Sequence, residues 1–212
     1  HQAYASSPAL HGESLLIVAA DNKKSGALAC LNRMDGKIIW KVGRPKKPNY
    51  ASPVIYELDG RQQLVMTGCD LVSSYNPLTG EKLWEIKGAT TECVTTTVTD
   101  GTHVYSSGGY PKNHVSAIRA DGSGKIAWSN NIRVYVPSMI VNNGYLYGIA
   151  DAGAYVCAHG VSFLSASAVA DAPSNSCTDS LPNARPDNRA NASAERPSDL
   201  AADTPADGTA YE

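Results

Sequence analysis

The residues of this sequence whose types could support chemistry gather between Ser106 and His114. The segment reads SSGGYPKNH, and it brings an aromatic ring, an ammonium group and an imidazole together as Tyr110, Lys112 and His114. Its two adjacent glycines allow a ligand to approach the backbone closely. We predict that these three side chains form a functional loop for a small ligand or a partner protein. The plainer alternative is an elongated connection between two strands.

Two further patterns raise the question of a metal site. His103 and His114 lie 11 residues apart on expected neighbouring strands, where two imidazoles can share a metal. The segment DGSG at 121–124 has some oxygen ligands of a calcium loop but lacks the closing glutamate. No second ligand cluster accompanies the histidines, and no nucleophile elbow or HExxH motif occurs. We therefore predict no metal site and no catalytic residue, and we interpret 121–124 as a turn.

A regular scaffold must position these residues, and the three tryptophans indicate its period. Trp40, Trp84 and Trp128 are 44 residues apart, and they close the similar segments MDGKIIW, LTGEKLW and GSGKIAW. A glycine lies four residues before each tryptophan, at Gly36, Gly80 and Gly124. Fixed periodicity of this length is typical of repeat architectures.

Each repeat contains short runs with the pattern of antiparallel strands. In the second repeat these runs are SPVIYEL, QLVMTG, LVSSY and KLWEIK, and the turns between them contain Asp59-Gly60 and Thr79-Gly80. A dipeptide that ends in glycine between such runs indicates a hairpin. Four strands in about 44 residues are typical of one blade of a β-propeller.

The fold class that we predict is therefore all-β, a partial β-propeller of about three and a half four-stranded blades. The blades are expected at residues 1–44, 45–88 and 89–132, with part of a fourth at 133–160. A tryptophan on the outer strand can dock between adjacent blades and bury about 150–250 Å². We assign this docking role to the three tryptophans and their turn glycines.

The composition changes from about residue 161. Alanine, serine, aspartate, proline and asparagine dominate, and the tryptophan expected near position 172 is missing. Such a segment buries too little apolar surface to offset the entropy of ordering, so we predict that 161–212 is a disordered tail. Because the break falls inside a blade, we interpret the tail as out of frame, after a frame shift near 157–161. A genuine disordered extension is the alternative.

Composition and charge exclude several classes of protein. The net charge is −2 and no basic stripe occurs, which argues against nucleic acid as a partner. No run of 18 apolar residues predicts a membrane span, and no signal peptide is visible. The five cysteines form no C-x-x-C pair, so we interpret them as small buried apolar residues. The basic segment GRPKKPNY at 43–50 is interpreted as a solvated connection between blades.

The segments LNRMDGKIIW, YNPLTGEKLW and RADGSGKIAW resemble the tryptophan-docking repeat of the pyrroloquinoline quinone-type β-propellers. The resemblance covers about Tyr4 to Gly160. This superfamily contains quinoprotein alcohol dehydrogenases, a non-enzymatic scaffold lipoprotein of outer-membrane barrel assembly, and many secreted bacterial propellers. The resemblance therefore implies a bacterial protein with a periplasmic or extracellular location. Propellers need roughly 4–8 blades to close, so we expect a fragment of a larger protein that is unstable or aggregates alone.

The resemblance leaves two main functions open. We favour a non-catalytic scaffold or ligand-binding propeller with a protein partner or small ligand at its rim. The alternative is a fragment of a quinone-dependent alcohol or sugar dehydrogenase, for which pyrroloquinoline quinone and calcium would be the cofactors. Such enzymes often have a pair of adjacent cysteines under the quinone, and this sequence has none. A propeller module fused to a signalling domain is a third possibility, and the cofactor stays unknown.

Overall fold

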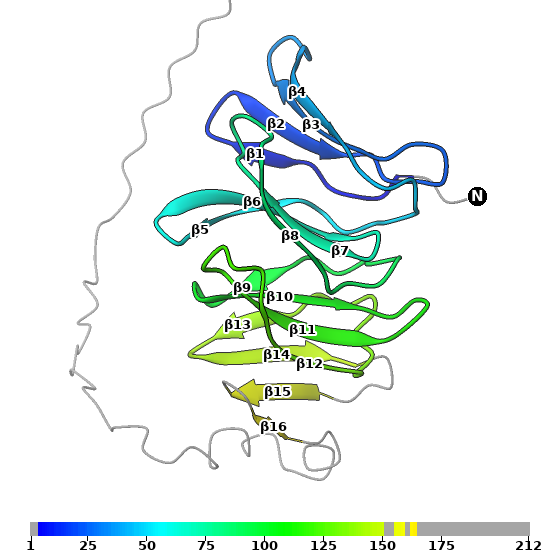
Figure 1. Ribbon diagram of the computed structural model, residues 1–212, viewed down its shortest axis with the longest axis vertical. Helices are drawn as coiled ribbons and strands as arrows, with labels where there is room; N and C mark the ends of the chain where they lie inside the picture. Colours follow the sequence, from blue (N-terminus) through cyan, green and yellow to red (C-terminus); the bar gives the residue numbers. More distant parts are fainter. Residues whose placement is uncertain (1–3, 151–154, 160–161, 165–212) are drawn as a thin grey trace, which may run out of the picture.

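The computed structural model describes residues 4–150 and two further strands at 155–159 and 162–164. Every regular element in these residues is a β-strand, and none of them forms a helix able to cross a membrane. The strands form four antiparallel sheets of four strands each, and every strand pairs with its neighbour in sequence. The sheets are stacked in chain order from β1 to β16 (Figure 1).

The strands of each sheet follow one another directly along the chain. Sheet 1 contains β1 (Ala9–His11), β2 (Leu15–Ala19), β3 (Ala27–Asn32) and β4 (Ile38–Gly43). Sheet 2 contains β5 (Val54–Leu58), β6 (Arg61–Gly68), β7 (Leu71–Tyr75) and β8 (Lys82–Lys87). Sheet 3 contains β9 (Val98–Thr99), β10 (His103–Gly108), β11 (His114–Arg119) and β12 (Ile126–Asn130). Sheet 4 contains β13 (Ile140–Asn142), β14 (Tyr145–Ile149), β15 (Tyr155–His159) and β16 (Ser162–Leu164).

Apolar clusters fill the spaces between successive sheets. Between sheets 1 and 2 the buried cluster includes Ile17, Leu28, Trp40, Leu64 and Tyr75. Between sheets 2 and 3 it includes Val65, Val72, Trp84, Val104 and Ile118. Between sheets 3 and 4 it includes Tyr105, Val115, Val134, Met139 and Leu146. The core is therefore divided among the sheet interfaces, as expected when single sheets must be covered by their neighbours.

An irregularity recurs next to each tryptophan. The register between the third and fourth strands of sheets 1, 2 and 3 shifts after Cys30, Ser74 and Ala117. These three residues are the cross-strand partners of Trp40, Trp84 and Trp128. A bulge of this kind increases the local twist of a strand pair. Each outer strand therefore twists at the same point of the repeat.

The predicted all-β architecture of repeated four-stranded sheets is confirmed, but several strands differ from the expected runs. The run YVPSMIV at 135–141 was expected to be a strand, but β13 begins only at Ile140. The run CVTTTVT at 93–99 was expected to be the first strand of sheet 3, but β9 contains only Val98 and Thr99. The reason is that a side chain replaces the backbone ladder there: Thr95 Oγ1 donates to the carbonyl of Ser107 at 3.0 Å. Residues 93–97 therefore run along β10 without pairing as a strand.

The fourth sheet extends further than the sequence indicated. Strand β16 lies within the predicted tail and pairs with β15, so that Leu164 is the cross-strand partner of Cys157. The three residues of β16 complete the sheet without the tryptophan of the other repeats. The rest of the predicted tail, and with it the reading-frame interpretation, lies outside the described residues.

Candidate functional site

The candidate site lies along one edge of the stack, which we call the loop edge. In an antiparallel sheet, the turn between the second and third strands lies at the same end as the connection to the next sheet. Six such segments form the loop edge: residues 20–26, 44–53, 69–70, 88–97, 109–113 and 131–139. The segment predicted to be functional, 106–114, contributes its middle part to this edge.

Backbone hydrogen bonds join neighbouring segments of the loop edge. The amide of Cys69 donates to the carbonyl of Thr91 at 2.8 Å. The amide of Glu92 donates to the carbonyl of Tyr110 at 3.2 Å. Segment 88–97 is therefore bonded to the loops on both of its sides, which keeps the edge ordered without strand pairing.

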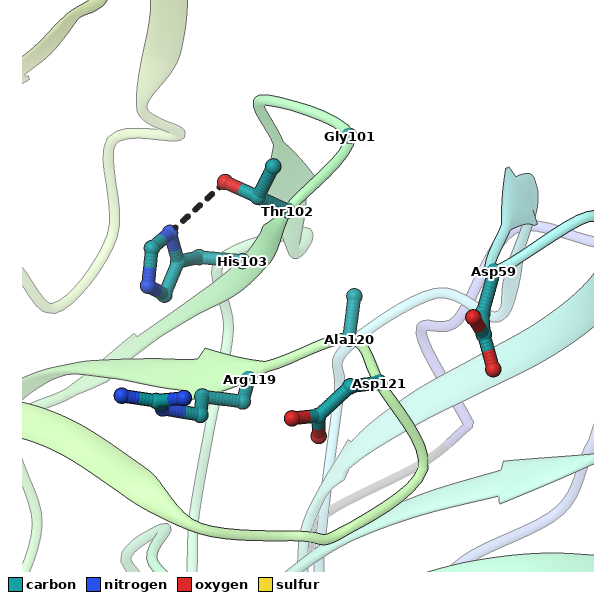
Figure 2. Close-up of a pocket in the computed structure, with 7 residues that line it drawn as sticks. All are labelled: Asp59, Gly101, Thr102, His103, Arg119, Ala120 and Asp121. Atoms are coloured by element: carbon teal, nitrogen blue, oxygen red, sulfur yellow. Dashed lines mark hydrogen bonds between the residues drawn. The ribbon is translucent and has the colours of Figure 1, made fainter.

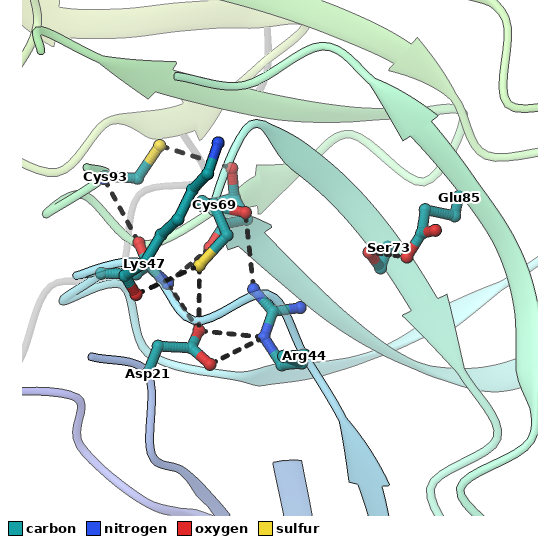
Figure 3. Close-up of polar contacts among 10 residues, drawn as sticks. Asp21, Arg44, Lys47, Cys69, Ser73, Glu85 and Cys93 are labelled. Carbon is teal, nitrogen blue, oxygen red and sulfur yellow. Dashed lines mark hydrogen bonds and ion pairs between the residues drawn. The ribbon is translucent and has the colours of Figure 1, made fainter. Parts of the chain in front are cut away.

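A buried ion pair links the loop between β2 and β3 to the start of the connection that follows β4 (Figure 3). Arg44 Nε donates to both carboxylate oxygens of Asp21, at 2.9 and 3.1 Å. The exposed fractions of the two side chains are 1% and 0%. Burial on its own would lower the pKa of Arg44, but the Asp21 carboxylate outweighs that effect and raises it. Arg44 is therefore a buried guanidinium whose charge Asp21 balances.

Asn49 extends this network toward sheet 3. Its Nδ2 donates to Asp21 Oδ2 at 3.2 Å and to the carbonyl of Thr67 at 2.9 Å. Its Oδ1 accepts a hydrogen bond from the amide of Cys93 at 3.2 Å. The Asn49 side chain approaches Gly68 so closely that a Cβ added to this glycine would lie 1.9 Å from Asn49 Oδ1. One amide side chain thus bonds to two segments of the loop edge and to the end of β6.

These contacts correct the interpretation of segment 43–50 as a solvated connection. It does connect sheets 1 and 2, but Arg44 and Asn49 are buried, with exposed fractions of 6% and 1%. Loops that stack on one another must satisfy their own polar groups, which requires buried donors and acceptors. The sequence carries no local signal for this pairing, because Asp21 is 23 positions from Arg44.

Two cysteines of the loop edge are buried and unreactive. Burial, with a contribution from Asp21, raises the pKa of the Cys69 thiol to about 12. Burial likewise raises the pKa of Cys93. Since the thiolate is the nucleophilic form, neither thiol suits covalent catalysis. Together with Cys30 they are free and buried, which confirms the interpretation for these three cysteines.

A pocket of about 570 Å³ opens at the loop edge of sheet 2. Lys47 forms an ion pair with Asp70, and Thr91 Oγ1 donates to Asp70 at 2.7 Å. Burial would raise the pKa of Asp70, but the bonds from Lys47 and Thr91 lower it, so the carboxylate stays charged. The lining residues are Pro45, Lys47, Cys69, Asp70, Leu71, Lys87, Gly88 and Ala89.

The structure separates the three residues of the predicted functional loop. Tyr110 is 56% exposed and Lys112 is exposed, and both lie on the loop edge. His114 begins β11 and is buried, with its Nε2 3.3 Å from Ser106 Oγ and its Nδ1 without a partner. Burial lowers the pKa of His114 to about 4, so the imidazole is neutral near pH 7. His114 therefore belongs to the interior rather than to the exposed loop.

A tyrosine that sequence analysis did not select lies next to this loop. A Cβ at Gly109 would be 2.6 Å from Tyr135 Cβ, so the ring packs directly on the loop backbone. The Tyr135 hydroxyl donates to Glu92 Oε2 at 3.3 Å, and the guanidinium of Arg133 lies 5.4 Å from the ring centroid. The only sequence signal for Tyr135 was that it begins the run YVPSMIV at 135–141, which was expected to be a strand.

A second pocket, of about 410 Å³, lies at the opposite end of sheets 2 and 3 (Figure 2). His103 lines it, with Nδ1 3.0 Å from Thr102 Oγ1 and 3.3 Å from Asp100 Oδ2. His103 pairs with Arg119 across the hairpin, whereas His114 pairs with Gly108 at its other end. The two histidines therefore cannot share a metal. Among the described residues, no group of three His, Cys, Asp or Glu is placed to hold one.

The three tryptophans all lie on the face of their sheet that meets the next sheet. Trp40 stacks on the turn of sheet 2: a Cβ at Gly80 would lie 2.7 Å from its ring, and its Nε1 donates to the carbonyl of Pro77 at 3.0 Å. Trp84 packs in the cluster between sheets 2 and 3, and its Nε1 donates to Gln63 Oε1 at 2.9 Å.

Trp128 and the other turn glycines follow the same arrangement less closely. Trp128 is half-buried, and its ring centroid lies 5.9 Å from that of Tyr105. Gly124 is covered by Ile86 rather than by a tryptophan: a Cβ added to Gly124 would lie 2.6 Å from Ile86 Cγ2. A Cβ added to Gly36 would have nothing within 4 Å. All three glycines have positive φ, between +63° and +73°.

Comparison with known proteins gives structural neighbours of low sequence identity. BamB from Moraxella catarrhalis aligns with a TM-score of 0.55 and 17% identity, over 73% of this chain and 46% of that protein. The computationally designed protein Ika4 aligns with a TM-score of 0.58 and 10% identity, over 76% of this chain and 94% of that one. Quinohemoprotein alcohol dehydrogenase from Comamonas testosteroni aligns with a TM-score of 0.53 and 13% identity, over 76% of this chain and 35% of that protein.

These likenesses establish the fold alone, and the chain spans about half the length of the BamB that it matches. A comparison with curated protein sequences gives no match. The sequence pattern of the family described as outer membrane protein assembly factor BamB matches residues 1–160. The predicted resemblance to the pyrroloquinoline quinone-type repeats is thereby confirmed, and the chain belongs to the BamB-like family of these repeat proteins.

Proposed function

We propose that this chain is a non-catalytic scaffold that binds a protein through its loop edge, in the periplasm or outside a bacterial cell. The observation that carries the proposal is the set of tyrosines along that edge: Tyr50, Tyr110 and Tyr135. Tyrosine is enriched in protein interfaces because its ring supplies a large contact area at a small entropic cost. The family description supports a partner that takes part in outer membrane protein assembly.

The loop edge presents these rings on an ordered backbone. The hydrogen bond between the Glu92 amide and the Tyr110 carbonyl fixes one loop, and the contact between Tyr135 and Gly109 fixes it from the other side. Less conformational entropy is lost when a surface that is already ordered binds its partner. Charged groups beside the rings, such as Glu92 and Arg133 at Tyr135, can set the orientation of the partner.

Site-specific photo-cross-linking tests this proposal in bacteria that express the whole chain. A photoreactive amino acid replaces Tyr110, which is 56% exposed, or in the control Met34, which is 79% exposed in the turn before β4. We expect position 110 to cross-link a protein of outer membrane assembly, and position 34 to cross-link none. The same products at both positions, or none at position 110, would contradict a partner site at the loop edge.

The dehydrogenase alternative requires a site for calcium and a quinone. Among the described residues, no group of three His, Cys, Asp or Glu is placed to hold a metal ion, which supports the scaffold. The sequence also has no adjacent cysteines. We expect no dye reduction when the chain is mixed with pyrroloquinoline quinone, calcium, an alcohol or glucose, and an artificial electron acceptor. Reduction that depends on the protein would overturn the non-catalytic proposal.

A further inference from the structure

We propose that the loop edge binds an acidic peptide segment of its protein partner, and that a carboxylate of this segment enters the pocket of about 570 Å³ at sheet 2. We call this cavity the lysine pocket, because Lys47 and Lys87 line it. The inference rests on the proposed function and deepens it, since it names the chemistry that the partner must present.

The loop edge is basic, although the chain as a whole has a net charge of −2. The six segments of the loop edge contain seven lysines or arginines and three acidic residues, which gives them a net charge of +4. The described turns at the opposite ends of the strands contain three basic and six acidic residues, a net charge of −3. These turns are residues 12–14, 33–37, 59–60, 76–81, 100–102, 120–125 and 143–144. Positive charge is therefore concentrated on the edge where we place the partner, and it attracts an acidic surface.

The acidic residues of the loop edge do not neutralise its exposed lysines. Asp21 is buried in its pair with Arg44, and Asp70 pairs with Lys47. The exposed lysines that have no ion-pair partner among the described residues are Lys23, Lys24, Lys46 and Lys112. These ammonium groups are therefore available to a partner.

The lysine pocket adds a specific place for one carboxylate. Lys87 ends β8, is exposed and has no ion-pair partner among the described residues, so its ammonium group can bind an incoming anion. Its cross-strand partner Leu71 lines the same pocket, together with Pro45 and Ala89. The pocket thus combines one available cation with apolar walls, which is the usual make-up of a ligand site.

The wall of the pocket is ordered by bonds within the loop edge. Cys69 and Asp70 form the turn between β6 and β7, both with positive φ, at +58° and +68°. The amide of Asp70 donates to the carbonyl of Thr90 at 3.1 Å, and the amide of Cys69 donates to that of Thr91. A wall that is already fixed loses little conformational entropy when a ligand binds.

The same wall favours a peptide over a phosphate polymer. The carboxylate of Asp70 bonds to Lys47 and Thr91, which uses two of its roughly four acceptor positions. It can still accept a hydrogen bond from a peptide N–H group, whereas it repels phosphodiesters. An acidic side chain on Lys87 and a neighbouring apolar side chain against Leu71 therefore fit the pocket together.

Fluorescence anisotropy tests the pocket with the whole chain and a labelled decapeptide of alternating glutamate and leucine. We expect this peptide to bind more weakly as the salt concentration rises, and the same peptide with glutamine in place of glutamate not to bind. Lys87→Glu should weaken binding about tenfold, because it replaces an attraction with a repulsion of similar size. The control Lys37→Glu makes the same charge change in the turn between β3 and β4, where the side chain is 81% exposed, and should leave binding unchanged.

Three results would overturn the lysine pocket. They are no binding of the acidic peptide, equal weakening by Lys87→Glu and Lys37→Glu, or equally strong binding of a ten-nucleotide single-stranded DNA. If circular dichroism shows that Lys87→Glu is unfolded, Lys87→Gln replaces it and should weaken binding about threefold, because only the attraction is lost.

The cross-linking experiment at position 110 separates this inference from the proposed function. Lys87→Glu should reduce the cross-linked product, and Lys37→Glu should not. If position 110 cross-links a partner equally well in both variants and the acidic peptide does not bind, the lysine pocket is wrong while the proposed function stands. If position 110 cross-links nothing but the acidic peptide binds through Lys87, the pocket stands and the proposed function fails.

Discussion

Individual polar residues hold the loop edge together by pairing inside it. Arg44 and Asp21 are buried as a charged pair, and Asn49 bonds to two segments of the loop edge and to the end of β6. Removing two charges from water is costly, and the attraction between them repays that cost only when both partners are present. The energetic importance of such residues therefore shows most clearly when one member of a pair is removed.

Replacing Asp21 with asparagine should destabilise the chain by about 3–5 kcal/mol, because it leaves the Arg44 guanidinium buried without its anion. The control is Asp70→Asn at the exposed pair with Lys47, whose side chains are 46% and 43% exposed. That change should cost no more than about 1 kcal/mol. Urea unfolding followed by tryptophan fluorescence measures both. Equal losses for the two variants would contradict the assigned role of burial.

His114 should make the chain sensitive to acid. Its pKa is about 4 in the folded chain and 6.5 in the reference state, so between these values the unfolded state binds the additional proton. The free energy of unfolding should therefore fall as the pH drops from 6.5 to 4, by up to about 3 kcal/mol. His114→Gln should flatten the fall over that range in urea titrations. An unchanged slope in the variant would show that another group titrates.

The turns between outer strands set how one sheet meets the next. Gly80 combines a positive φ with the closest approach of a tryptophan, while the bulge opposite Trp40 twists the strand that carries the ring. We propose from these contacts that the tryptophans dock successive sheets. Trp128, which is only half-buried, should contribute least to stability among the three.

Two glycines with similar backbone angles separate docking from backbone strain. Gly80 has φ +73° and lies under Trp40, whereas Gly60 has φ +68° in the turn after β5 with nothing within 4 Å. Gly60→Ala should cost about 1 kcal/mol, the strain of the left-handed conformation. Gly80→Ala should cost at least twice as much, because the ring must also move. Thermal unfolding of the two variants provides the comparison, and equal costs would argue against docking at Gly80.

The whole molecule is a stack in which each sheet depends on its neighbours for cover. Among the described residues, buried clusters cover sheets 2 and 3 on both faces. In such a stack the stability is close to a sum of interface contributions, so each interface raises it.

The repeat in the sequence was sufficient to predict the architecture, because its signals are local. The spacing of Trp40, Trp84 and Trp128 and the glycine turns before them depend only on neighbours within one repeat. The sequence also placed Tyr110 and Lys112 on an exposed loop, as the structure has them. The position of β16 escaped prediction, because a strand of three residues carries too little pattern.

Tertiary structure alone decided which polar residues are buried. Asp21 and Arg44 are separated along the chain and meet only when β2, β3 and β4 pair in sheet 1, and His114 is buried only because β11 lies inside sheet 3. Local periodicity specifies the strands, whereas burial and pairing depend on contacts between residues that are distant in sequence.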